Sequence, residues 1–261
     1  MKWGLEVDSF LQPIVTKGLL VGARVSMLMV FAPFFGSASV PMRLKTGLTV
    51  ALTVLLYPTL TGSLNVLSSS NWVGILIGEM LVGLAMGLSI QFVLEGMLLA
   101  GQILGFQMGF SLENIIDPQT QVDTPVLSIF HQSIALLIFL QLNVHHWLLR
   151  GLAKSFEYLP PGAVVVTAAT TAGLLRAAGG MLLVGLQIAA PALVATFVVD
   201  VTLGFIGRAA PQFPVVLMGI SVKGLMGMLI IWASVALWPR VLESHFQSAI
   251  VTAERLLRLA R

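Results

Sequence analysis

The chain has 261 residues, of which 57% are hydrophobic and only 10% are charged, and its net charge is +3. Because soluble domains carry about 25% charged residues, this composition excludes an ordinary water-exposed surface and predicts a polytopic membrane protein, or a subunit buried among similar subunits. The lack of cysteine excludes disulfides, thiol catalysis and cysteine-based metal sites, and the small basic excess at the C-terminus suits anionic lipid headgroups better than nucleic acid.

Apolar segments follow one another along the chain, each close to or longer than the ~20 residues that cross a bilayer as a helix. The six segments are 12–35, 44–62, 71–105, 126–150, 172–206 and 213–239. Proline, or a run of Ser, Asn and Gly, lies in every break and favours a turn. The predicted fold is therefore an all-α polytopic membrane protein. Segments 71–105 and 172–206 are long enough to be kinked helices or pairs of half-helices.

The two ends of the chain differ in character. Residues 1–18 lack the basic start and cleavage site of a signal peptide, so they are expected to belong to the mature protein. Residues 240–261 mix apolar side chains with Arg, Glu and His, which predicts an amphipathic cytoplasmic helix. This helix would follow a single helical domain at 1–239.

Lysine and arginine in the connections predict the orientation, because cytoplasmic loops are enriched in them. With six spans, the side that holds both termini carries Lys2, Arg150, Lys154, Arg240, Arg255, Arg258 and Arg261, and the opposite side carries Arg43, Lys45 and Arg208. Both termini are therefore expected in the cytoplasm.

Single ionisable residues interrupt the apolar segments. By position they are the acids Glu79, Glu95 and Asp200 and the bases Arg24, Arg176 and Lys223. A charge at the centre of a spanning helix costs about 2.5–3.5 kcal/mol on insertion scales, so each implies a buried partner, a wet cavity or a neighbouring subunit. Two interpretations stay open for these charges, namely structural partners that set the register of helices and subunits, or carriers of protons or cations.

Glycines are dense between 74 and 109, and several of them are spaced four residues apart. The GxxxG pairs are Gly74/Gly78, Gly83/Gly87, Gly101/Gly105 and Gly105/Gly109. Such a stripe lets another backbone approach closely. It indicates either packing within the chain or contact with other subunits, and its length favours other subunits.

The segment 105–125 is the least membrane-like long stretch of the chain. It combines Phe106, Met108, Phe110, Ile115 and Ile116 with three acids, and glycines at its start permit bending. It is either a solvated loop or a flexible, apolar-tipped element that closes a pore.

No enzymatic site is convincing. The adjacent His145 and His146 point in different directions on a helix and have no nearby carboxylate in sequence. Ser111 with His131 as base would suit an intramembrane hydrolase, but Leu112 stands where the glycine after such a serine is expected. No HExxH motif and no phosphate-binding loop occurs. The chain is expected to be no enzyme and to need no metal and no cofactor.

Several strings in a fixed order extend over almost the whole chain. They are Pro33-Phe34-Phe35-Gly36, Pro41-x-Arg43-x-Lys45-x-Gly47, Gly78-Glu79-x-x-x-Gly83, Ala100-Gly101-Gln102, Gln107-Met108-Gly109-Phe110, Asp117-Pro118, Asn143-x-His145-His146, Ser155-Phe156, Pro160, Ala190-Pro191, Asp200-x-x-x-Gly204 and Arg208-x-x-Pro211-Gln212, with Arg24 before them and Lys223 after. Together they resemble the FliR family, the R-type export-gate proteins of flagellar type III secretion, which correspond to the T-type subunit of injectisomes.

The resemblance implies a helical subunit that is similar to a P-type and a Q-type gate protein joined end to end. One copy would complete a ring with several P-type and Q-type subunits, through which unfolded export substrates pass. A plug that closes this pore at rest corresponds to 105–122, and its expected residues are Phe106, Gln107, Met108, Gly109, Phe110, Ile115 and Ile116. Arg24, Glu79, Glu95, Asp200 and Lys223 would be buried charges at subunit contacts, and Pro33, Pro41, Gly101, Asp117, Pro118, Arg208, Pro211 and Gln212 would shape loops and packing.

We therefore expect a subunit of the inner-membrane export gate, placed in the flagellar basal body rather than in an injectisome. Its partners would be the P-type and Q-type subunits, other membrane proteins of the export apparatus, unfolded substrates and lipid, without nucleic acid. The alternative function is a proton- or cation-coupled transporter of small solutes. Helices of the assembled gate in this family are tilted and partly above the membrane, so apolar segments can be covered by neighbouring subunits instead of lipid.

Overall fold

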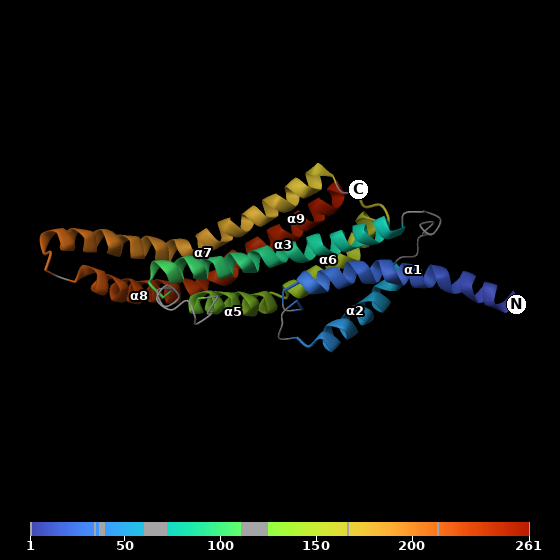
Figure 1. Ribbon diagram of the computed structural model, residues 1–261, viewed down its shortest axis with the longest axis horizontal. Helices are drawn as coiled ribbons and strands as arrows, with labels where there is room; N and C mark the ends of the chain where they lie inside the picture. The colour runs from blue at the N-terminus through green and yellow to red at the C-terminus, as the bar shows by residue number, and fades with distance from the viewer. Residues whose placement is uncertain are drawn as a thin grey trace. The chain divides into compact units, whose positions relative to one another are not determined.

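The computed structural model describes residues 2–33, 35–36, 40–59, 72–110, 125–165, 167–212 and 214–260. Within these ranges the chain is helical apart from short connections, and it contains no strand (Figure 1). The elements are α1 (Lys2–Phe31), α2 (Met42–Leu56), the 3-10 turn η1 (Tyr57–Thr59), α3 (Trp72–Gln107), α5 (Val126–Gln141), α6 (Val144–Tyr158), α7 (Ala168–Ala209), α8 (Val215–Ser234), the 3-10 turn η4 (Val235–Leu237) and α9 (Trp238–Leu259). The predicted all-α, polytopic fold is confirmed.

Four stretches are long and apolar enough to cross a membrane. They are Ile14–Phe31, Trp72–Gln107, Ala168–Ala209 and Met218–Leu259. A fifth span is possible if α5 and α6, which meet at a bend of 64°, are taken together. The helix α2 has 15 residues, which is short of the ~20 residues that a span needs. Pro58 lies two residues after its end and cannot continue an α-helix, because it has no backbone N–H to donate.

The two longest predicted segments are continuous helices. α3 has 36 residues and α7 has 42, with Pro191 in the interior of α7. Neither is a pair of half-helices. By contrast, the predicted segment 126–150 is broken between α5 and α6 at Asn143, whose φ of 55° is left-handed. Asn tolerates this conformation better than most residues, and it ends the first helix and begins the second.

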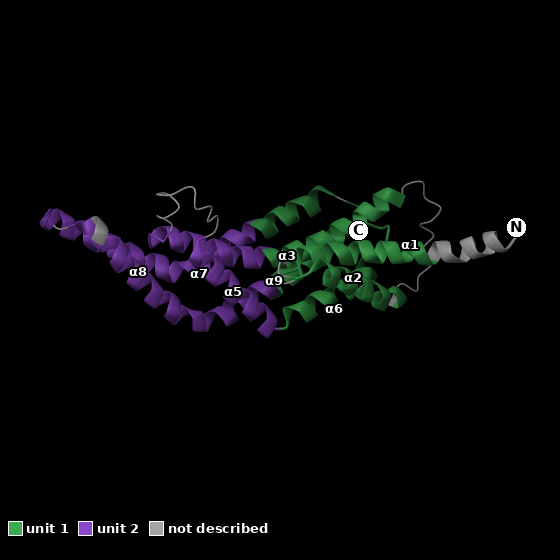
Figure 2. Ribbon diagram, turned by 60° about the horizontal axis from the view of Figure 1, so that its bottom comes forward, with its two compact units in different colours: residues 1–91, 143–178, 247–261 green, residues 92–142, 179–246 purple. Residues whose placement is uncertain are grey.

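The described residues fall into two compact units, shown in different colours in Figure 2. Unit 1 comprises residues 1–91, 143–178 and 247–261, and unit 2 comprises 92–142 and 179–246. Each unit therefore brings together segments that lie far apart in the sequence.

The core of unit 1 forms where α1 packs on the first half of α3. Val21, Val25 and Leu28 of α1 are fully buried. A Cβ at Gly83 would collide with the carbonyl oxygen of Arg24, and one at Gly87 would lie 2.9 Å from the Cβ of Phe31. Only glycine allows the two backbones to come this close.

The core of unit 2 is built in the same way around the second half of α3. A Cβ at Gly96 would lie 2.8 Å from the Cβ of Val184 in α7, and one at Gly101 would collide with the backbone of Ser128 in α5. Further along, the rings of Phe139 and Phe246 meet edge to face at 5.8 Å. Small residues thus set the helix spacing, and aromatic rings fill the space that remains.

Candidate functional site

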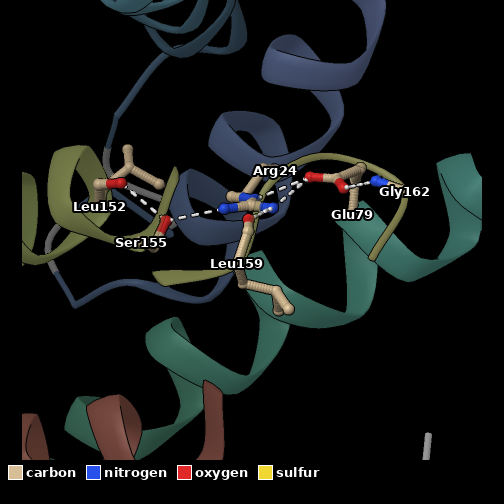
Figure 3. A network of polar contacts seen from close by, with 6 residues as sticks. All are labelled: Arg24, Glu79, Leu152, Ser155, Leu159 and Gly162. Atoms are coloured by element: carbon tan, nitrogen blue, oxygen red, sulfur yellow. Dashed lines mark hydrogen bonds and ion pairs between the residues drawn. The ribbon is translucent and has the colours of Figure 1, made fainter. Parts of the chain in front are cut away.

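The first polar cluster of the protein surrounds Arg24 in unit 1 (Figure 3). Its Nε donates to Oε2 of Glu79 at 2.8 Å, and its Nη2 lies 2.6 Å from the same oxygen. Nη1 donates to Oγ of Ser155 at 3.0 Å, and Nη2 donates to the carbonyl oxygen of Leu159 at 3.0 Å. The other carboxylate oxygen of Glu79 accepts the backbone N–H of Gly162 at 3.1 Å.

Both charged side chains of this cluster are completely buried. The guanidinium also lies 4.2 Å from the ring centroid of Phe156, within the range of a cation–π contact. A buried ion pair is tolerated when further hydrogen bonds satisfy its remaining donors and acceptors, and here the protein supplies them. The cluster therefore joins α1, α3, α6 and the 159–162 connection without any group from a neighbouring subunit.

The second polar cluster lies in unit 2 and joins three helices. Oδ1 of Asp200 on α7 lies 3.0 Å from Nζ of Lys223 on α8. Oδ2 of Asp200 accepts a hydrogen bond of 3.0 Å from Nε2 of Gln107, the last residue of α3. The side chains of Asp200 and Lys223 are 40% and 21% exposed. Asp200 is thus neutralised within the chain, and its second oxygen holds the end of the helix that leads into the candidate plug.

The remaining membrane-segment charges have different settings. Glu95 is half-buried on α3, and Arg176 is exposed on α7. The structure therefore pairs two of the three acids with two of the three bases in separate clusters.

The described part of the candidate plug, residues 105–110, alternates exposed and buried side chains. Phe106 is 71% exposed and Phe110 is 50% exposed, whereas Met108 is 1% exposed. Met108 packs against Gly227 of α8, where an added Cβ would lie 2.5 Å from its Sδ. Gly109 has a φ of 84°, which favours glycine and ends α3 in a turn.

The other plug positions, Ile115 and Ile116, lie outside the described residues, as do Asp117, Pro118 and Ser111. For 105–110, two aromatic rings are presented outward from a turn that a buried methionine holds in place.

The predicted loop and packing residues lie at helix ends or close approaches. Pro33 is buried after α1, Pro41 is the N-cap of α2, and Gly101 provides the contact with α5. Arg208 in the last turn of α7 and the turn residues Pro211 and Gln212 are exposed. These three lie at the end of α7 and in the α7–α8 connection, and they belong to neither polar cluster.

Four glycines of the stripe pack against other segments of the same chain. Gly78 faces Val164, Gly83 and Gly87 face α1, and Gly101 faces α5. The expectation that the stripe contacts other subunits is therefore wrong for these glycines. Sequence spacing alone cannot tell a neighbouring helix of the same chain from one of another chain, because both need the same flat surface.

Sequence reasoning missed the uncharged partners in the Arg24 cluster. Ser155, the carbonyl of Leu159 and the N–H of Gly162 complete its hydrogen bonds. Ser155-Phe156 belongs to the family resemblance, but nothing in the pattern of apolar residues links Ser155 to Arg24, which lies 131 residues away.

Within the described ranges, the histidines are not part of any group of three or more potential metal ligands. His131 is buried beneath Trp238, with ring centroids 4.9 Å apart, and its Nδ1 hydrogen bonds to the carbonyl of Leu127 at 2.7 Å. The rings of His145 and His146 lie 4.2 Å apart. These histidines belong to helix packing.

The similarity to known proteins extends over residues of both units. The family model of bacterial export proteins, family 1, matches residues 15–249. The chain is 31% identical over 248 residues to the flagellar biosynthetic protein FliR of Bacillus subtilis (strain 168), covering 92% of this chain and 94% of the relative. It is 31% identical over 196 residues to the protein of the same name in Escherichia coli (strain K12), covering 75% of each. The corresponding protein of Aquifex aeolicus (strain VF5) is 27% identical over 226 residues, covering 85% and 86%.

Proposed function

This chain belongs to the bacterial export proteins, family 1, and we propose that, as a subunit of the type III protein export gate in the inner membrane, it joins P-type and Q-type subunits to line a channel for unfolded flagellar proteins. Its role is that of a structural channel component. A coupled transporter of small solutes is not favoured, since the relatives are named as flagellar biosynthetic and export proteins. In keeping with this, Asp200 is held by Lys223 and Gln107.

The closing element is the turn at the end of α3, and one observation carries this assignment. Phe106 and Phe110 are exposed on either side of buried Met108, although large aromatic side chains are usually buried in packed helices. Two rings presented from a turn can project into a narrow pore and exclude water from it. Met108 fixes the position of the turn because it fills the space above Gly227.

The Gln107–Asp200–Lys223 cluster acts as a latch on this turn. Gln107 directly precedes Met108 and is tied to α7 through Asp200, whose charge is balanced by Lys223 on α8. Opening the turn would break the Gln107 hydrogen bond without leaving Asp200 unpaired. The latch therefore favours the closed state by a modest free energy, which an arriving substrate can overcome.

Exposed apolar side chains indicate where partner subunits or lipid cover the chain. On α7 and α8 the large exposed hydrophobic residues include Phe197, Phe205, Leu225 and Trp232. The helix α2 has no buried residue at all. Permanent protein interfaces are strongly hydrophobic, so these helices suit contacts with the P-type and Q-type subunits.

The test is the ion conductance of gates that carry Phe106→Ala and Phe110→Ala together. We expect the double variant to leak ions, because two methyl groups leave the aperture open, while the chain itself still folds because neither ring belongs to its buried core. Membrane conductance would be recorded in cells that produce the gate. Native mass spectrometry of the purified gate would verify one copy of this chain with several copies of two other small membrane proteins.

The matched control removes two exposed rings elsewhere, with Phe197→Ala and Phe205→Ala on α7. Gates that still assemble with this control should stay closed. A double plug variant that assembles and conducts no more than wild type would refute the closing role of 105–110. A lone monomer or homodimer, from cells shown to make the other subunits, would refute the subunit assignment.

A further inference from the structure

A groove of about 400 Å³ lies in unit 1 between α6 and the last turns of α9. Its polar lining consists of Arg150 and Lys154 on α6 and Glu254 on α9, and Trp147 and Ile250 are among its apolar lining residues. Both walls belong to the green unit in Figure 2. Its volume is within the range of about 300–1,000 Å³ that is usual for small-ligand sites.

The charged groups of the groove are available to a ligand. Within the ranges that the structure describes, Arg150, Lys154 and Glu254 form neither an ion pair nor a side-chain hydrogen bond with other residues. Two cations against one carboxylate leave the groove net positive, and both cations are exposed. A ligand that neutralises them must carry negative charge and must fit beside an indole ring and a short apolar wall.

The helices that form the groove favour a ligand from the membrane surface. α6 and α9 are the most strongly amphipathic of the described helices. Their apolar faces pack inside unit 1, where Leu152, Phe156, Leu256 and Leu257 are buried, so Arg150 and Lys154 lie on the outward polar face. Clustered Lys and Arg beside apolar segments bind anionic lipid headgroups. Tryptophan is likewise enriched at the depth of the headgroups, which places Trp147 at the level where a phosphate would meet Arg150 and Lys154.

We propose that this α6–α9 groove binds the headgroup phosphate of an anionic glycerophospholipid, such as phosphatidylglycerol. Arg150 and Lys154 hold the phosphate, Trp147 packs against the glycerol and the first acyl carbons, and Ile250 continues the apolar wall. Glu254 repels the same phosphate and limits the affinity. The site is separate from the polar clusters of Arg24 and Asp200, and it does not depend on the closing role of Phe106 and Phe110.

The test uses the full chain, purified in a mild detergent and titrated with phosphatidylglycerol or phosphatidylcholine, with bound lipid counted by native mass spectrometry. Each cation near an anionic membrane surface strengthens binding by roughly fivefold. The double variant Arg150→Gln/Lys154→Gln is therefore expected to bind phosphatidylglycerol roughly 30-fold more weakly. Phosphatidylcholine should bind weakly to wild type and variant alike.

Two further variants separate the groove from a general effect of charge. Arg176→Gln/Arg240→Gln removes two exposed arginines outside the groove and should leave phosphatidylglycerol binding unchanged. Glu254→Gln removes the repelling carboxylate and should strengthen binding, a gain that a damaged fold would not produce.

Equal weakening by both double variants, or no effect of Glu254→Gln, would overturn the proposal. The groove would also be no lipid site if Arg150→Gln/Lys154→Gln kept its phosphatidylglycerol but lost another protein of the export apparatus. In that case the cations would recognise an acidic protein segment. None of these results depends on whether the gate closes at Phe106 and Phe110.

Discussion

Arg24 shows how protein groups satisfy one fully buried charge. Its guanidinium donates to a carboxylate, a hydroxyl and a carbonyl, and Phe156 covers its face. These partners come from α3 and from the end of α6 with its C-cap, so the arginine on α1 fixes the positions of the three helices relative to one another. Removing one partner would leave a buried charge without compensation, which costs far more than the pair itself contributes.

Replacing Glu79 by alanine is therefore expected to destabilise the chain strongly. The free energy of unfolding should fall by about 3–5 kcal/mol, because Arg24 would stay buried without its counter-charge. The matched control is Asp200→Ala, whose ion pair is partly exposed and should contribute at most about 1 kcal/mol. Thermal unfolding of the purified chains in detergent would measure both.

Exchanging the two charges, Arg24→Glu with Glu79→Arg, should not restore the stability. The swapped arginine would face the N–H of Gly162, and the swapped glutamate would face the carbonyl of Leu159, so donors would meet donors and acceptors would meet acceptors. If the exchanged chain melted at the wild-type temperature, charge balance alone would be enough to stabilise the site.

The sequence could predict neutralisation of these charges but not the pairing. Arg24 and Glu79 are separated by 55 residues, and each of the three membrane-segment acids was an equally good partner by composition. The uncharged partners leave even less signal, since any backbone carbonyl or N–H can serve. Which groups meet depends on how α1, α3 and α6 pack, and this is a property of the folded chain.

At the scale of helices, the length of the apolar segments predicted which parts of the chain are helical. It did not predict where the helices break. All six apolar segments contain helices, because only a helix satisfies its own backbone in an apolar environment. The break at Asn143 was missed, since residues on both sides are apolar enough to continue a span. The early end of α2 could have been found from Pro58, which removes a backbone donor.

A second prediction concerns the Gln107–Asp200–Lys223 latch at the end of α3. Gln107→Ala removes the hydrogen bond to Asp200 and should shift the ratio of closed to open gates about fivefold toward open, since such a bond contributes about 1 kcal/mol. The leak should be smaller than that of Phe106→Ala/Phe110→Ala, because the rings remain. Membrane conductance of assembled gates would measure the shift.

Gln132→Ala on α5 is the matched control for this substitution, because its partly buried amide lies outside both polar clusters. It should conduct as wild type does. If Gln107→Ala gates conduct no more than Gln132→Ala gates, the Gln107–Asp200 bond has no part in closure.

For the whole molecule, the distribution of Lys and Arg predicts that both termini are cytoplasmic. The chain has no cysteine, so single cysteines report the side of the membrane without a background. Ala209→Cys, beside the exposed α7–α8 connection, should react with an impermeant maleimide added from the periplasmic side. Arg255→Cys on α9 should react only after the membrane is opened, and the reverse pattern would invert the orientation.

The composition of the molecule predicted its class, and the order of its motifs predicted its family, but neither predicted the two compact units. Unit 1 combines residues from the start, the middle and the end of the chain, and unit 2 fills the intervals between them. Such an arrangement follows from contacts between distant segments, which an apolar pattern read along the sequence does not contain.

The Arg24 cluster also has a consequence in time. Arg24 is synthesised 55 residues before Glu79 and 135 residues before Leu159. Translation proceeds at about 5–20 residues per second. The carboxylate of Glu79 is therefore synthesised roughly 3–11 s after Arg24, and the carbonyl of Leu159 roughly 7–27 s after it. During that interval α1 carries an uncompensated charge and cannot enter lipid cheaply. The insertion machinery is therefore expected to retain α1 until α3 and α6 have been made.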